Sequence, residues 1–267
     1  MTTPPGSAVL GAFGLSGELR LLVGGKVATW GVADAVLKPA EGVPETVWRS
    51  EVLTALPDSP DFRIARPVPT LDGSWLFDGW EAAMFVAGQA EPRRVDAVVH
   101  AGQAFHRAIA ALPRPSFLEF REDLWTYGDR LAWQEQVPPG STAPSPLLAP
   151  LMAARRPVTV PAQVVHGDLI GNVLFADGLP PAIIDWPAYW RPPAWAAAVA
   201  VTDALVWHHV SPDVVGRWAH LPGWDQMLIR ALIYRIATWP AARWLTSPDD
   251  AYRPVVDLVV ADSASWD

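Results

Sequence analysis

The 267-residue chain contains no cysteine. It therefore has no thiol that could act as a nucleophile, form a disulfide or ligate zinc. The HExxH, GxSxG and Walker GxxxxGK[ST] patterns are also missing, so zinc proteases, serine hydrolases and P-loop enzymes lack their starting residues. Any chemistry of this chain has to rest on other side chains.

Positive charge is scarce. The formal net charge is −8, and the 20 basic residues form no run along the sequence. A nucleic-acid surface needs clustered Lys and Arg, so we expect no nucleic-acid partner. Two of the basic residues, Lys26 and Lys38, are lysines, and the others are arginines. A lysine can be retained in such a chain because a compact ammonium fits a phosphate pocket differently from a planar guanidinium. The alternative is that the two lysines are present by chance, and the count of lysines does not distinguish these explanations.

Long hydrophobic runs are missing as well. The most apolar interval, residues 194–206, is too short to cross a membrane and contains Asp203. The N-terminus has neither a basic start nor a long apolar stretch, so we expect no signal peptide and no membrane partner. Hydrophobic residues make up 51% of the chain, enough for a packed core. We therefore expect a folded cytoplasmic protein with one large domain or two small ones.

The segment 164–186 concentrates the polar chemistry and reads VVHGDLIGNVLFADGLPPAIIDW. Two apolar runs, 173–176 and 182–184, flank the turn signal Asp177-Gly178 and predict an antiparallel hairpin. Asn172 stands just before the first run and Asp185 just after the second. The open end of a hairpin brings two such positions together. Carboxylate and amide oxygens suit magnesium, which usually accompanies phosphates.

This segment resembles the catalytic segment of aminoglycoside phosphotransferases and choline-kinase-like enzymes. The resemblance rests on His166-Gly167-Asp168, on Asn172 before a hairpin and on Asp185 after it. It implies a protein-kinase-like fold, in which these residues correspond to the catalytic loop and the metal site. Asp168 would accept or orient the proton of the attacking hydroxyl, His166 would brace the catalytic loop, and Asn172 and Asp185 would bind magnesium.

Two departures from the family pattern indicate a divergent branch. The step from Asp168 to Asn172 is four residues, whereas kinases usually have five. The acidic residues that the family often carries after the metal-site aspartate are missing around Arg191, and Asp203 could take over their structural role.

The N-terminal third resembles the small lobe of a kinase. Residues 19–23, 27–32 and 35–37 predict three strands, and residues 74–77 and 80–86 predict two more. Under the resemblance, a turn of Gly24, Gly25 and Lys26 would lie over the nucleotide phosphates. Lys38, at the end of the third strand, would hold the α- and β-phosphates, and Glu51, on a helix predicted at residues 45–56, would pair with Lys38.

The expected fold is α+β, with a five-stranded N-lobe over residues 1–87 and a mainly helical C-lobe over residues 88–267. Phe85, Val86 and Ala87 would form the hinge that binds the adenine. Further helices are predicted at residues 95–112, 116–135, 147–156, 194–208, 227–239 and 252–260.

The resemblance implies an ATP- or GTP-dependent phosphotransferase that uses Mg²⁺ and acts on a hydroxyl of a small molecule. A nucleotide-binding pseudokinase, serving as a regulatory or scaffold module, is the alternative that the short loop favours. A protein kinase is a weaker third option, because Gly167 replaces the usual arginine and no APE pattern follows. The acceptor and the oligomeric state stay open, because a fold does not determine a substrate.

Overall fold

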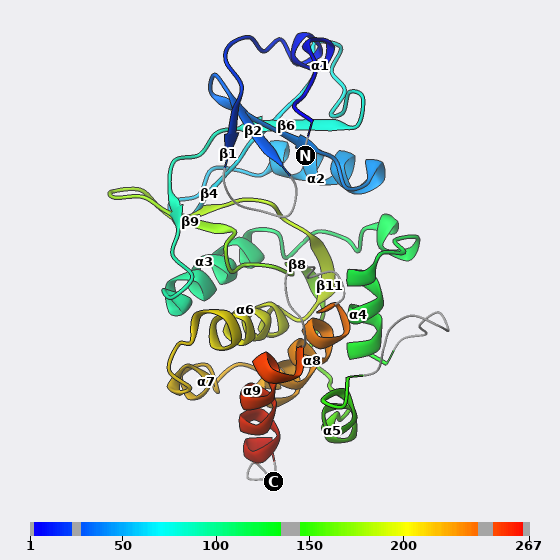
Figure 1. Cartoon of the computed structure of the whole chain (residues 1–267), viewed down its shortest axis with the longest axis vertical. Helices are drawn as coiled ribbons and strands as arrows, with labels where there is room; N and C mark the ends of the chain where they lie inside the picture. Colours follow the sequence, from blue (N-terminus) through cyan, green and yellow to red (C-terminus); the bar gives the residue numbers. More distant parts are fainter. Residues whose placement is uncertain (1–2, 23–27, 135–144, 240–247, 264–267) are drawn as a thin grey trace. The chain divides into compact units, whose positions relative to one another are not determined.

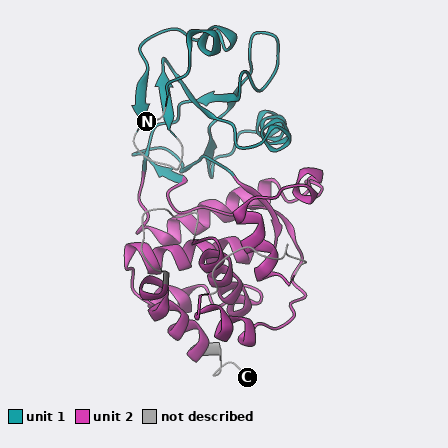
Figure 2. Cartoon of the chain, turned by 45° about the vertical axis from the view of Figure 1, so that its right-hand side comes forward, with its two compact units in different colours: residues 1–89, 173–186 teal, residues 90–172, 187–267 magenta. Residues whose placement is uncertain are grey.

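The structure is a computed structural model that describes residues 3–22, 28–134, 145–239 and 248–263. The chain forms two compact units (Figures 1 and 2). Unit 1 comprises residues 1–89 and 173–186, and unit 2 comprises residues 90–172 and 187–267. Unit 1 is therefore discontinuous in sequence. The lobe limits proposed above, 1–87 and 88–267, stay a prediction.

A five-stranded antiparallel sheet forms the main part of unit 1, in the order β1-β2-β3-β6-β5. Its strands are β1 (Arg20–Leu22), β2 (Thr29–Val32), β3 (Ala35–Pro39), β5 (Pro67–Val68) and β6 (Trp80–Met84). Val32 and Leu37 are fully buried in the core beneath α1 (Ser7–Ala12). The prediction that this sheet has five strands is confirmed.

The identity of one strand differs from the prediction. Residues 74–77 form no strand of the sheet, and Pro67–Val68 takes the fifth place. The reason is a tight turn at Asp78-Gly79, where both residues have positive φ, 48° and 76°. This turn joins Phe77 to Trp80 by two backbone hydrogen bonds, so the preceding residues form only a short bridge to β6.

The predicted hairpin is present. Its strands β9 (Val173–Phe175) and β10 (Ala182–Ile183) pair antiparallel, with Val173 opposite Ile183. They belong to a second sheet of unit 1 with the order β4-β10-β9-β7, completed by β4 (Arg63–Ile64) and β7 (Gln89–Ala90). β10 and β4 run parallel, although more than a hundred residues separate them.

Helix α2 (Val43–Ala55) packs against β5 in unit 1. Its buried positions are Thr46, Ser50 and Leu53, which recur at helical spacing on one face. Glu51 lies outside this face and is exposed. The predicted limits of this helix, 45–56, agree closely with the observed ones.

Unit 2 is mainly helical. Its helices are α3 (Val95–Ala108), η1 (Ser116–Glu119), α4 (Leu124–Ala132), α5 (Leu148–Ala154), α6 (Pro193–His208), α7 (Asp213–Arg217), α8 (Trp224–Ala237) and α9 (Pro248–Ser263). Helix α8 packs against α4, α5, α6 and α9, and α6 also packs against α3. Helix α6 is mostly apolar and is buried from Ala194 to Val206, as expected for a helix enclosed by others.

Two features of unit 2 were not predicted. Residues 116–135 were expected to form one helix, but η1 and α4 are separate. The side chain of Asp123 caps the start of α4 by accepting a hydrogen bond from the Thr126 N–H at 2.6 Å. The strand β11 (Ala188–Arg191) was also missed. It pairs antiparallel with β8 (Gln163–His166) to form a two-stranded sheet.

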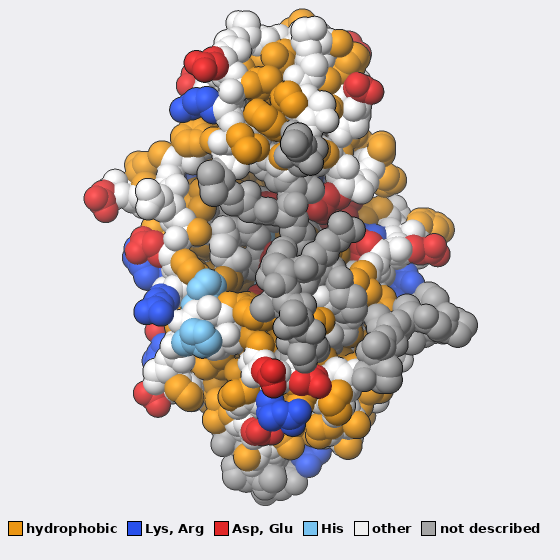
Figure 3. Space-filling model, viewed as in Figure 1, with side chains coloured by type: hydrophobic (Ala, Val, Ile, Leu, Met, Phe, Trp, Pro, Cys, Tyr) orange, Lys and Arg blue, Asp and Glu red, His pale blue; other side chains and the backbone are white. Residues whose placement is uncertain are grey.

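The surface shows mixed charge. On the face drawn in Figure 3, Lys and Arg side chains are scattered among Asp and Glu, and hydrophobic side chains gather over the end of unit 1 near α1. None of the helices in the described part of the chain has the length and hydropathy to cross a bilayer.

Candidate active site

The sheet of unit 1 brings Lys38 to two carboxylates. Lys38 lies on β3 directly opposite Glu81 on β6, and its Nζ is 3.3 Å from the Glu81 Oε1. The same ammonium contacts the Asp185 carboxylate, which follows β10. Burial lowers the pKa of Lys38, but the charges of Asp185 and Glu81 outweigh it, so the pKa is raised overall. Lys38 is therefore held in its charged form.

Glu81 takes the place expected for Glu51. Within the described residues, the carboxylate partners of Lys38 are Glu81 and Asp185, and the predicted Lys38–Glu51 pair does not form. Glu81 also accepts two hydrogen bonds from the Arg49 Nη2, at 2.8 Å and 2.6 Å. The physical reason is register, because the antiparallel pairing of β3 and β6 sets Glu81 beside Lys38. The sequence offered one signal for this role, because Glu81 is an acidic residue within the otherwise apolar run 80–84.

Asp185 combines exposure with an unusual backbone. Its side chain is 48% exposed, and its φ of 49° lies in the left-handed region that non-glycine residues seldom adopt. Such conformations concentrate at functional sites. The next residue, Trp186, is buried and contacts Trp48 of α2, with ring centroids 5.3 Å apart. This contact anchors the segment that carries Asp185.

The predicted hinge connects β6 to β7. The Phe85 N–H donates to the Asp34 carbonyl, and the Ala87 carbonyl accepts from the Arg63 guanidinium at 2.9 Å. Val86 lies between these two anchored residues. The predicted phosphate turn of Gly24, Gly25 and Lys26 lies outside the described residues.

The residues predicted to form the catalytic loop belong to unit 2. His166 is fully buried, and its Nδ1 accepts a hydrogen bond from the Asp168 N–H at 3.1 Å. The backbone N–H of His166 donates to the His106 Nε2 at 2.9 Å. His166 thus braces the turn that presents Asp168. A Cβ on Gly167 would approach the ring of Tyr189 to 2.3 Å, so only glycine fits between the two.

Asp168 is held by a residue that the sequence did not reveal. One carboxylate oxygen of Asp168 accepts from the Arg235 Nη2 at 2.6 Å. Arg235, on α8, is nearly buried and also forms a two-point ion pair with Asp203 of α6. Burial raises the pKa of Asp203 to about 6, against the opposing effect of Arg235. Asp203 therefore holds Arg235, and Arg235 in turn holds the Asp168 carboxylate. The structural role suggested for Asp203 stays a prediction.

Asn172 is oriented by Asp168. Its Nδ2 donates to the Asp168 carbonyl at 2.7 Å and faces the Asp168 Oδ2 at 3.4 Å. Because the amide nitrogen is used in this way, the Asn172 Oδ1 is the end that can ligate a cation. The shortened four-residue step therefore still presents a hard oxygen, as magnesium prefers. The described residues contain no group of three or more His, Asp or Glu side chains arranged for a metal.

Comparison with solved structures defines the class of fold. The chain resembles an aminoglycoside phosphotransferase from Alicyclobacillus acidocaldarius, with 14% identity, a TM-score of 0.58 and coverage of 99% and 97% of the two chains. It also resembles APH(2")-IIia in complex with GDP and kanamycin, with 15% identity, a TM-score of 0.54 and coverage of 97% and 98%. A third match is the choline kinase LicA from Streptococcus pneumoniae, with 13% identity, a TM-score of 0.54 and coverage of 94% and 95%.

The chain therefore has the protein-kinase-like fold of aminoglycoside phosphotransferases and choline kinases. The fold expected from the sequence is confirmed, and the low identities fit a divergent branch. No protein-family model and no curated protein matches the sequence.

Proposed function

We propose that the chain is a phosphotransferase that uses ATP or GTP with magnesium and transfers the γ-phosphoryl group to a hydroxyl of a small molecule. The contact between Lys38 and Asp185 carries this proposal. An ammonium beside a carboxylate suits a metal-bound phosphate, because the ammonium can bind phosphate oxygens while the carboxylate binds the metal. The fold shared with phosphotransferases supports the proposal, as does the GDP bound by APH(2")-IIia.

Unit 1 would bind the nucleotide. Lys38 would hold the phosphates, and Glu81 would keep Lys38 in place from the adjacent strand. Asp185 would ligate magnesium together with Asn172, whose oriented amide oxygen fits this role. When bound, magnesium neutralises charge on the phosphates. Phe85, Val86 and Ala87 would lie along the purine.

Unit 2 would act on the acceptor. Asp168 would orient the hydroxyl and receive its proton while the hydroxyl oxygen forms the new bond to the γ-phosphorus. The bond from that phosphorus to the bridging oxygen breaks, and the nucleoside diphosphate leaves with this oxygen. Arg235 limits the freedom of the Asp168 carboxylate. The main contribution of Asp168 would therefore be to position the acceptor hydroxyl. The reaction would take place in the cytoplasm, and nucleic acids and membranes play no part in it.

A thermal-shift titration tests the proposal. ATP and GTP are added with and without magnesium to the wild type, to Asp185→Ala and to Asp177→Ala. Asp177 is an exposed acid in the turn of the same hairpin and serves as the matched control. A ligand that binds the folded state raises the melting temperature by mass action. We expect a magnesium-dependent rise that disappears in Asp185→Ala and persists in Asp177→Ala.

Other results would redirect the assignment. A rise that does not depend on magnesium would favour the nucleotide-binding pseudokinase, for which the short step from Asp168 to Asn172 is the specific observation. No rise with either nucleotide would contradict both functions.

A further inference from the structure

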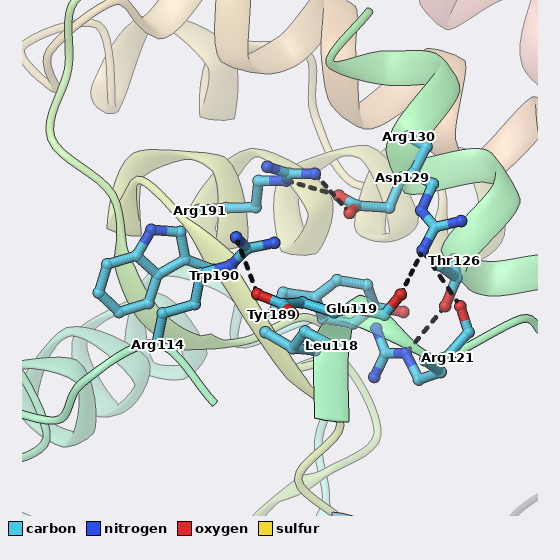
Figure 4. Close-up of a pocket in the computed structure, with 10 residues that line it drawn as sticks. All are labelled: Arg114, Leu118, Glu119, Arg121, Thr126, Asp129, Arg130, Tyr189, Trp190 and Arg191. Atoms are coloured by element: carbon cyan, nitrogen blue, oxygen red, sulfur yellow. Dashed lines mark hydrogen bonds and ion pairs between the residues drawn. The ribbon is translucent and has the colours of Figure 1, made fainter. Parts of the chain in front are cut away.

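Unit 2 contains a cavity beside its two-stranded sheet. The cavity has a volume of about 250 Å³ and lies between η1, α4 and β11. Figure 4 shows the four arginines of its lining, which are Arg114, Arg121, Arg130 and Arg191. All of these residues belong to unit 2. A cavity lined by four arginines is unusual in a chain with a net charge of −8.

The acidic residues of the lining do not balance these cations. Four arginines face two carboxylates, Glu119 and Asp129. Arg191 engages the Asp129 carboxylate through both oxygens, at 2.8 Å and 2.6 Å. Glu119 is exposed and lies 4.0 Å from the Arg114 Nη1, at the limit of an ion pair. Arg121 in turn lies 3.7 Å from the Asp123 carboxylate. Three of the four arginines therefore have an acidic neighbour, and the excess positive charge of the cavity is that of Arg130.

Arg130 holds the least compensated charge in the lining. It is half-buried, and the hydrogen bonds that its Nη2 donates to described residues are long, 3.5 Å to the Glu119 carbonyl and 3.4 Å to the Arg121 carbonyl. Within the described ranges, no carboxylate lies close enough to form an ion pair with Arg130. A partly buried guanidinium is best stabilised by an anion, and its planar fork matches carboxylate and phosphate groups.

The cavity borders the catalytic loop of the same unit. Tyr189 lines the cavity, and its ring packs directly against Gly167, between His166 and Asp168. The guanidinium of Arg121 lies over the same ring, 4.6 Å from its centroid. The cavity and the loop that carries Asp168 therefore share one aromatic wall.

We propose that this cavity is an anion-binding subsite that receives a phosphate or carboxylate group of the acceptor. The assignment of the anion to the acceptor rests on the proposed phosphotransferase function. It predicts hydroxyl substrates that carry negative charge. The binding of an anion by the cavity does not depend on that function.

Titration calorimetry with inorganic phosphate and with malonate tests the subsite. The proteins are the wild type, Arg130→Gln, Arg114→Gln, Lys38→Ala and Arg253→Gln. Arg253 is an exposed arginine of α9 outside the cavity and is the matched control. We expect Arg130→Gln to weaken binding of at least one anion about tenfold, the usual order for a lost charge-assisted hydrogen bond. Arg114→Gln should act in the same direction, and Arg253→Gln and Lys38→Ala should leave the affinity within about twofold.

Three results would overturn the subsite. The first is no binding of either anion by the wild type, and the second is equal binding by Arg130→Gln and the wild type. The third is loss of binding in Lys38→Ala alone, which would assign the anion to the nucleotide phosphates. Because Arg114 is exposed, Arg114→Gln keeps the test valid if Arg130→Gln does not fold.

Nucleotide consumption tests the assignment to the acceptor. Glycerol, glycerate, glycerol phosphate and choline are compared as acceptors with wild type and Arg130→Gln. We expect turnover with an anionic alcohol, and an acceptor KM about tenfold higher in Arg130→Gln with an unchanged nucleotide KM. Turnover with glycerol or choline alone, or with none of the four, overturns the acceptor assignment. If phosphate binds in the cavity while no nucleotide binds, the subsite stands and the proposed function fails.

Discussion

His106 is 3% exposed in unit 2. Burial, together with the neighbouring His166, lowers the pKa of His106 to about 3 from an ordinary value of 6.5. Between these two values the unfolded chain binds a proton that the folded chain does not. The free energy of unfolding must therefore decrease as the pH falls through this window.

We predict that His106→Gln makes stability less dependent on pH. A single group of this kind contributes up to about 1.4 kcal/mol for each pH unit inside the window. Urea unfolding at pH 4, 5, 6 and 7 should show a shallower dependence in His106→Gln than in the wild type. The exposed His220 provides the control, because His220→Gln should retain the wild-type dependence. Identical slopes in all three proteins would rule out His106 as the responsible group.

Single residues also show which site contacts could be read from the sequence. Lys38 and Asp185 were identified by type and position, and the fold brings them into contact. Glu81 and Arg235 were missed because each acts through a partner distant along the chain, Lys38 and Asp168 respectively. An isolated acid in a strand or an arginine in a helix has no local pattern that reveals such a partner.

At the scale of secondary structure, a pair of tryptophans connects α2 to the end of the β9–β10 hairpin. Trp186 is 2% exposed and contacts Trp48. We predict that Trp186→Ala lowers the free energy of unfolding by about 3–5 kcal/mol, the usual cost of removing a large buried aromatic side chain. Trp186→Phe should recover much of this loss, because an aromatic ring still fills the site.

Urea unfolding of these two variants checks this prediction, with Phe77→Ala as the control. Phe77 is a 39% exposed aromatic residue in unit 1, and its removal should cost much less. If Trp186→Ala cost no more than Phe77→Ala, the contact would not anchor the hairpin. Asp185 directly precedes this anchor, so the nucleotide-induced thermal shift expected under the proposed function should also weaken in Trp186→Ala.

Elements with a clear pattern were predicted well, and those defined by tertiary contacts were not. The amphipathic α3 and the apolar α6 follow from their hydrophobic patterns, and the hairpin follows from its turn signal. β5 and β11 are short, and only their partners β6 and β8 make them strands. Short strands of this kind carry too few residues to establish a period of two.

At the scale of the whole molecule, unit 1 is complete only when residues 173–186 are present. The parallel pairing of β10 with β4 includes a hydrogen bond from the Arg63 N–H to the Pro181 carbonyl at 2.8 Å. The hairpin also contributes buried apolar residues, including Val173, Ala182 and Ile183. A chain that ends at residue 89 would leave this edge and this surface exposed.

We predict that a fragment of residues 1–89 loses protection of the Arg63 amide against hydrogen exchange. In the full chain, the amide should exchange slowly, because its hydrogen bond is made within a sheet. The Leu37 amide of the central strand β3 serves as an internal reference for residual structure. Equal protection of the Arg63 amide in the fragment and the full chain would show that β4 does not need the hairpin.

Local pattern was sufficient to predict the hairpin with Asn172 before it and Asp185 after it, because turn chemistry and hydrophobic period act over a few residues. The kinase-like order of elements was predicted from the resemblance to phosphotransferases. The partners of these groups required the tertiary structure. Sheet register placed Glu81 beside Lys38, helix packing placed Arg235 beside Asp168, and the fold gathered Arg114, Arg121, Arg130 and Arg191 around one cavity. Each of these arrangements joins residues that are distant in sequence, and only close packing determines which of them meet.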